Sequence, residues 1–247
     1  MNAPTQATAG LLLSLVLFGT DLGAQTLYSF GNLSLNRLDW NHTPKRPRRD
    51  FSYLELEGGA GYRWGELYGF ADLENFDRAS DQHSVLLKGQ LRYYLDGQSG
   101  RAGPNLFLQS KAAQGQGWHE YSQVLGLGYN LKLGQGWFSP FAGPLYTDTG
   151  WGFSGWNGHQ LGWAANLPFK IGQQSMMLAN WNEIDLARQR HYLPAGAARP
   201  SWNGALSLWW KASERWSLGL KYRYARDTLG AAGWTDAWIA TLKVDLP

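Results

Sequence analysis

Residues 234–246, WTDAWIATLKVDL, alternate in character with a period of two. One face carries Trp234, Asp236, Trp238, Ala240, Leu242, Val244 and Leu246, and the other carries Thr235, Ala237, Thr241, Lys243 and Asp245. A period of two predicts a β-strand, because successive side chains of a strand point to opposite faces. The first face has Trp at one end and aliphatic residues in the middle, and a mainly polar face backs it. This pattern is typical of a membrane β-barrel strand with lipid on one side.

The composition supports the same fold class. The chain of 247 residues has 14 Trp, 12 Tyr and 31 Gly but no Cys, and charged residues make up only 17%, below the usual value of about 25%. Mean hydropathy is −0.38, and no stretch approaches the roughly 20 apolar residues of a spanning helix. Low charge with negative hydropathy favours a barrel, because only half of each strand needs to be apolar.

The N-terminus has the features of a signal peptide. An apolar run, Leu11 to Phe18, is followed by a plausible cleavage site after Ala24. Residues 1–9 lack the usual Lys or Arg, and a buried segment of a soluble domain is the alternative interpretation. We expect a signal peptide over residues 1–24 and one outer-membrane barrel over residues 25–247.

The remaining pattern predicts an all-β fold, a transmembrane antiparallel β-barrel with twelve strands. The expected strands are 27–36, 51–64, 66–76, 83–95, 105–111, 118–132, 137–147, 156–169, 175–185, 201–211, 215–226 and 234–246. An even number lets both ends of the chain meet on the same side of the membrane. Connections after even-numbered strands are mostly short and several after odd-numbered strands are long, as expected for periplasmic turns and external loops. The repeated motif GQGW, at 115–118 and 134–137, indicates two hairpin turns.

Four further strands show an apolar face with aromatic residues toward the ends, as in the girdles of membrane barrels. These faces are Val85, Leu87, Gly89, Leu91, Tyr93 and Leu95; Leu125, Leu127, Tyr129 and Leu131; Leu161, Trp163, Ala165, Leu167 and Phe169; and Trp216, Leu218, Leu220, Tyr222 and Tyr224. A soluble β-sandwich would also alternate, but would carry more charge on its exposed face.

The opposite faces would line the lumen. The second strand presents Tyr53, Glu55 and Glu57, the third Glu66, Tyr68, Phe70, Asp72 and Glu74, the fourth Ser84, Lys88, Gln90, Arg92 and Tyr94, and the eleventh Lys221 and Arg223. We therefore expect the acids of strands two and three to adjoin the bases of strand four, with a transverse field across the lumen. The aromatic rings among them could stack on a flat solute. The alternative is that these side chains only fill a narrow barrel.

Two segments carry a family resemblance. FSYLELE at 51–57 and LYGFAD at 67–72 resemble the nucleoside-specific channel-forming proteins of Gram-negative outer membranes, the Tsx-like family. The resemblance implies a monomeric twelve-stranded barrel with a keyhole-shaped lumen that passes nucleosides and deoxynucleosides. By matching positions it places Tyr53, Glu55, Glu57, Tyr68, Phe70 and Asp72 on or near the substrate path. The inward bases Lys88 and Arg92 complete the expected path.

Parts of the sequence also fit functions other than passive transport. The basic run of Arg37 to Asp50 could contact lipopolysaccharide phosphate, and no nucleic-acid motif accompanies it. A plugged barrel acting through its loops, as an adhesin or phage receptor, is one alternative. A lipid hydrolase is another, but His119 and Ser122 are three residues apart and so point to opposite faces. The sequence predicts no enzyme, metal or cofactor.

Overall fold

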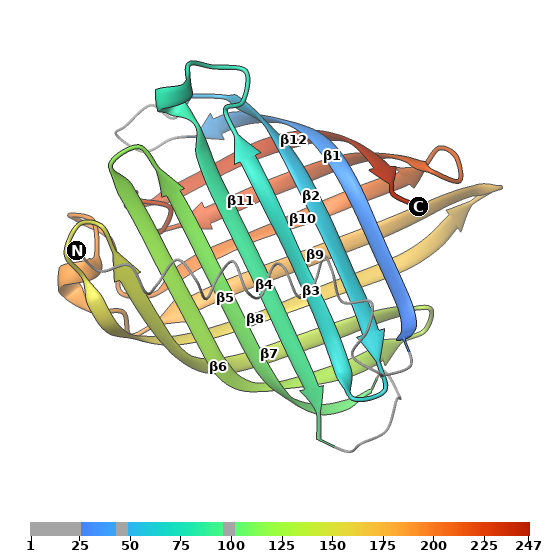
Figure 1. Ribbon diagram of the computed structural model, residues 1–247, viewed down its shortest axis with the longest axis horizontal. Helices are drawn as coiled ribbons and strands as arrows, with labels where there is room; N and C mark the ends of the chain where they lie inside the picture. The colour runs from blue at the N-terminus through green and yellow to red at the C-terminus, as the bar shows by residue number, and fades with distance from the viewer. Residues whose placement is uncertain (1–25, 43–48, 96–101) are drawn as a thin grey trace.

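The structure, a computed structural model, describes residues 26–42, 49–95 and 102–247 (Figure 1). The predicted signal peptide, residues 43–48 of the basic run and residues 96–101, between the fourth and fifth predicted strands, lie outside these residues. Neither of the short helices in the described ranges is long and apolar enough to cross a membrane.

Twelve antiparallel strands close into a barrel. They are β1 (Thr26–His42), β2 (Phe51–Tyr62), β3 (Gly65–Glu74), β4 (Ser84–Tyr94), β5 (Gly103–Gly115), β6 (Trp118–Leu133), β7 (Gly136–Thr149), β8 (Ser154–Ile171), β9 (Gln174–Leu186), β10 (Ser201–Lys211), β11 (Trp216–Arg226) and β12 (Trp234–Asp245). Two short 3-10 helices, η1 (Ser80–Gln82) and η2 (Arg190–Tyr192), lie in loops. Each strand pairs with its neighbours in sequence, and β1 closes the ring against β12, as the blue and red strands of Figure 1 show.

The predicted number of strands is confirmed, but several strands are longer than predicted, β1 and β5 by the most. β1 continues to His42 because its second half pairs with β12, from Arg37 opposite Ala240 to Trp40 opposite Ala237. β5 spans Gly103–Gly115, because it pairs along the full length of β4. In both cases, hydrogen bonding to the adjacent strand extends the β-strand beyond the residues whose alternation predicted it.

The predicted hairpin turns form at both GQGW motifs. Gly117 and Gly134 have φ values of +76° and +59°, a conformation that glycine adopts without steric cost. Trp118 begins β6, and Trp137 is the second residue of β7. Each motif therefore reverses the chain and starts the next strand with an aromatic residue at or beside its first position.

The outward faces are as predicted. Leu125 and Leu127 on β6 and Leu220 on β11 are exposed, at 63%, 61% and 50%. Tyr129 and Trp216 are exposed on the same faces. Exposure of large apolar side chains on the outer wall of a closed barrel fits a lipid environment.

The inward face is less polar than predicted. Leu38 and Tyr53 pack with Ala237 and Ile239 in one buried cluster. A second cluster joins Phe107, Val124, Phe141 and Leu145, and the rings of Phe107 and Phe141 stack with centroids 4.0 Å apart. These side chains fill parts of the barrel interior and leave a narrower space for polar groups.

Candidate functional site: the lumen

A charged bridge crosses the interior of the barrel. Lys88 Nζ on β4 lies 2.5 Å from Glu183 Oε1 on β9. Four strands separate β4 from β9 on one side of the ring and six on the other, so the pair spans the lumen. Gln109 on β5 also donates to Glu183 Oε1, at 3.1 Å. The sequence predicted acids of the second and third strands beside Lys88, whereas its partner, Glu183, belongs to β9.

Trp181 lies beside this bridge. Its ring centroid is 5.6 Å from Lys88 Nζ and 4.9 Å from the guanidinium carbon of Arg223. A cation over an aromatic face is attracted by the ring quadrupole. A lumen-facing indole is thus held between cations of two different strands.

Glu57 joins three strands near the closure of the barrel. Its carboxylate accepts hydrogen bonds from Tyr68 on β3 at 2.7 Å, from Asn32 on β1 at 3.0 Å and from Lys243 on β12 at 2.9 Å. Glu55, two residues earlier, lies 4.0 Å from Lys221 on β11. The prediction that these acids face the bases of strand four is wrong, because closing the sheet brings β11 and β12 beside them.

Trp209 on β10 packs against the same two lysines. Lys243 Nζ lies 4.3 Å and Lys221 Nζ 5.3 Å from its ring centroid. The lysines therefore have an indole on one side and a glutamate on the other. This arrangement links β10 to β2 across three intervening strands.

Among the aromatic residues predicted on the path, Tyr68 and Phe70 lie together. Their ring centroids are 6.4 Å apart at an interplanar angle of 65°. Tyr53 belongs instead to the buried apolar cluster described above. Asp72 is buried, and its Oδ1 atom has no hydrogen-bond partner among the described residues.

Arg92 occupies a different part of the wall. Its guanidinium donates to Asn105 Oδ1 at 3.3 Å and to the carbonyl oxygen of Ser139 at 3.0 Å, and it lies over the ring of Phe107. These contacts tie β4 to β5 and β7. In the ladder Arg92 is opposite Glu66, four residues away from the Phe70–Lys88 pair.

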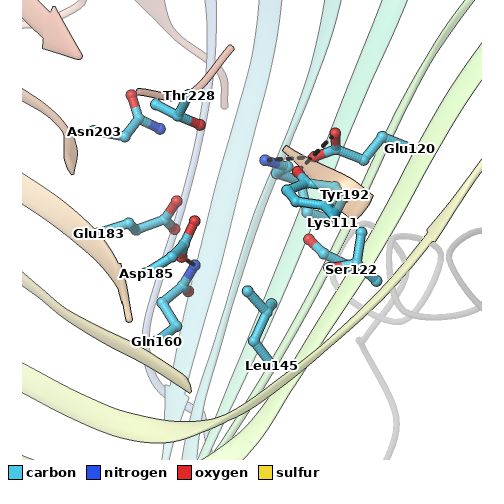
Figure 2. A pocket seen from close by; sticks show the side chains of 11 residues that line it. Lys111, Glu120, Ser122, Leu145, Gln160, Glu183, Asp185, Tyr192, Asn203 and Thr228 are labelled. Carbon is cyan, nitrogen blue, oxygen red and sulfur yellow. Dashed lines mark hydrogen bonds and ion pairs between the residues drawn. The ribbon is translucent and has the colours of Figure 1, made fainter. Parts of the chain in front are cut away.

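A small cavity lies near the end of the barrel that carries the loop of residues 187–200. Its volume is about 30 Å³, enough to hold water. Figure 2 shows Lys111, Glu120 and Tyr192 on one side and Glu183, Asp185 and Gln160 on the other. Longer loops mark the external end of such barrels, so this cavity faces the external mouth.

The loop of residues 187–200 reaches across this mouth. Tyr192 in η2 donates its hydroxyl proton to Glu120 Oε2 on β6, at 3.1 Å. Its ring also contacts Phe153 of the β7–β8 loop, with centroids 5.3 Å apart. Burial, followed by the charges of Glu120 and Asp185, raises the pKa of Tyr192 well above its ordinary value.

Arg188 holds the base of this loop. It is only 1% exposed, and its guanidinium donates to the carbonyl oxygens of Ala198, Arg199 and Asp227 at 2.8, 2.9 and 2.6 Å. The planar fork of arginine suits several carbonyl acceptors at once. The loops after β9 and β11 are thereby fastened to each other.

Sequence reasoning missed several lumen residues. Trp181, Glu183 and Asp185 alternate along β9, so the period of two could have placed them inward. Tyr192 lies in a loop without periodicity, and its contact with Glu120 depends on the tertiary fold. His119, considered for hydrolysis, instead lies 3.5 Å from Asp148. Among the described residues, no cluster of His, Cys, Asp and Glu could hold a metal ion.

Comparisons with known proteins agree with this architecture. The family model described as "Nucleoside-specific channel-forming protein, Tsx" matches residues 33–244. The NanC porin is 10% identical, with a TM-score of 0.51, over 87% of this chain and 100% of that chain. At this identity the likeness concerns the fold alone.

Two other solved structures align over most of their length. The KdgM porin in complex with disordered oligogalacturonate is 6% identical, with a TM-score of 0.47, over 87% of this chain and 99% of that one. The translocator domain of the autotransporter NalP from Neisseria meningitidis is 12% identical, with a TM-score of 0.47, over 98% and 95%.

Proposed function

Because the chain belongs to the family of nucleoside-specific channel-forming proteins, we propose that the side chains bridging its lumen select the solute. The protein is a channel of the outer membrane and not an enzyme, and nucleosides or similar small polar solutes diffuse through it passively. The observation that carries the proposal is the Lys88–Glu183 bridge. A solute that crosses the lumen has to pass beside this ion pair or displace it.

The proposed path begins at the external cavity. A solute first meets Glu120, Asp185 and Tyr192, whose oxygens can bond hydroxyl groups. It then passes the Lys88–Glu183 bridge beside Trp181. Both sets of groups suit a small neutral solute with several hydroxyls.

The path then follows the predicted residues of β2 and β3. Tyr68 and Phe70 offer ring faces, and Glu55, Glu57 and Asp72 offer carboxylates. Base–aromatic stacking contributes about 1–3 kcal/mol per base and tolerates different bases. Tyr53 and Arg92 act by holding the wall, through the apolar cluster and through the contacts to β5 and β7.

Refolded protein in planar bilayers and liposomes tests this path. Uptake should be faster for nucleosides than for sugars of similar mass, and nucleosides should block the ion current. Phe70→Leu and Tyr68→Leu should each weaken this block by about 1–3 kcal/mol. Tyr129→Leu, which removes a lipid-facing ring, is the matched control and should leave the block unchanged. Equal uptake of nucleosides and sugars would make the protein a general small-solute pore.

The oligomeric state, the contact with lipopolysaccharide and the role of the N-terminal residues are also proposals. We infer that the barrel works as a monomer, because its ring closes within one chain and leaves no free strand edge. The basic segment 37–50 is proposed to contact lipopolysaccharide phosphate at the external surface, and residues 1–24 to act as the signal peptide. Mass measurement of the detergent-solubilised barrel tests the first point, and N-terminal sequencing of the mature protein tests the last.

A further inference from the structure

One inward row of β1 consists of small polar residues, none of them among the lumen residues predicted from sequence. Asn32, Ser34 and Asn36 face the interior and are 4%, 0% and 0% exposed. Ladder pairing places Ser34 opposite Glu55, and Glu55 opposite Asp72 on the next strand. Ser34 and Asp72 therefore belong to the same transverse row of the wall.

Two ion pairs pass over this row. β1 lies between β12 and β2 in the ring, so the bridge from Lys243 on β12 to Glu57 on β2 has to cross it. The bridge from Lys221 on β11 to Glu55 on β2 crosses both β12 and β1. These flexible lysine side chains cover the small residues of β1 from the lumen side.

Beneath the bridges, polar atoms lack partners. Asn32 Oδ1, Ser34 Oγ, Asn36 Nδ2 and Asp72 Oδ1 have no hydrogen-bond partner among the described residues. A buried polar atom without a partner is unfavourable. A solute that supplies the missing hydrogen bonds removes that penalty, so this wall gains more from a polar ligand than a fully bonded wall does.

The four atoms differ in character. Asn36 Nδ2 can only donate, Asn32 Oδ1 can only accept, Asp72 Oδ1 can accept, and the Ser34 hydroxyl can do both. Their complement is a small neutral molecule that presents donors and acceptors along one edge. A nucleobase edge and the vicinal hydroxyls of a ribose both meet this description.

We propose that Asn32, Ser34, Asn36 and Asp72 form a hydrogen-bonding wall that binds the polar edge of the solute when the Lys243–Glu57 and Lys221–Glu55 bridges open. The inference rests on the proposed path and adds β1 to it as the strand that determines specificity. The bridges close the wall in the absence of solute, and the aromatic pair Tyr68 and Phe70 lies on β3, the strand that also carries Asp72.

Ser34→Ala is the sharpest test, because it removes a hydroxyl without a partner and leaves the bridges in place. Block of the bilayer current by uridine should weaken about 3- to 10-fold, the equivalent of one net hydrogen bond. Thermal stability should be unchanged or higher. Ser207→Ala is the matched control, a buried inward serine on β10, and should leave the block unchanged. Uracil and ribose, tested separately, show whether the base edge or the sugar hydroxyls bind the wall.

A second variant keeps the proposal testable if alanine is not tolerated. The chain has no cysteine, so Ser34→Cys provides a unique thiol beneath the bridges. A small polar thiol reagent should label it slowly, more slowly still with uridine present, and faster when Glu57→Gln removes one bridge. If neither uridine nor the Glu57→Gln substitution changes the rate of labelling, the proposal is overturned.

The possible outcomes distinguish failure of the proposed solute path from failure of the proposed β1 wall. Absence of uridine block in the unsubstituted protein contradicts the proposed selective path. Block that is present but equal in the unsubstituted protein and Ser34→Ala overturns the β1 wall and leaves the path intact. A weaker block together with reduced stability indicates a structural role for Ser34 and also overturns the proposal.

Discussion

Lys88 and Glu183 meet across the lumen, Nζ to Oε1 at 2.5 Å, although 95 residues separate them in the chain. Their side chains are only 12% and 8% exposed, so the pair is screened from bulk water more than a surface ion pair. Trp181 lies beside Lys88 and narrows the lumen at the same level. The pair therefore acts both as a brace between opposite walls and as an obstacle to solute flow.

Removal of this brace should have opposite effects on stability and on conductance. Lys88→Gln or Glu183→Gln alone leaves a buried charge without its partner, which costs about 3–5 kcal/mol in buried pairs. The double variant Lys88→Gln/Glu183→Gln should recover much of that loss and pass a larger current. Heat-modifiable gel mobility and single-channel recording measure the two effects. An unchanged current in the double variant contradicts the role as an obstacle.

A charge on the lipid face should destabilise the barrel according to its depth. Leu127→Arg and Leu220→Arg place guanidinium groups on exposed outward positions and should cost about 2–4 kcal/mol if near the midplane. Leu133→Arg, at the end of β6, is the control and should cost about 0–1 kcal/mol, as near an interface. Equilibrium unfolding from lipid vesicles gives these values. Equal costs at all three positions count against the assigned faces.

Arg188 should control the order of the external loop. Arg188→Ala leaves three carbonyl oxygens without their donor and should expose the 187–200 loop to protease while the barrel stays intact. Arg188→Lys should restore the protease resistance of the loop only in part, because an ammonium group lacks the planar fork of the guanidinium. Arg190→Ala in the same loop, at an exposed position, is the control. Similar cleavage rates for Arg188→Ala and Arg190→Ala would contradict the clamp.

Tyr192 should resist deprotonation. Its pKa is raised in the folded protein. The protonated phenol and its hydrogen bond to Glu120 therefore contribute fully to the stability of the fold at pH values below the ordinary pKa of about 10. This contribution is lost only as the pH rises through the higher folded-state pKa. The difference in phenolate absorbance between the unsubstituted protein and Tyr192→Phe should therefore titrate above pH about 10. Titration at or below that pH contradicts the buried hydrogen bond.

The alternation of residue types was enough to predict the barrel and its outer wall. A strand has only two faces, and lipid accepts only apolar and aromatic side chains on one of them. Leu127 and Leu220 could therefore be placed outward from sequence, and Glu57 and Lys88 inward. Pairing of each strand with the next followed from the short turns.

The partners of the inward charges depended on the tertiary structure. Alternation places Glu57 in the lumen but does not say which of the inward lysines lies within reach, since several strands, among them β4, β5, β11 and β12, each contribute one. Closure of β1 against β12 brought Lys243 to Glu57, and the width of the ring brought Lys88 to Glu183. The sequence by itself therefore determined the fold, the lipid face and the kinds of group in the lumen. Only the closed ring decided which of those groups touch, because contacts across a lumen depend on register and curvature rather than on the period of any single strand.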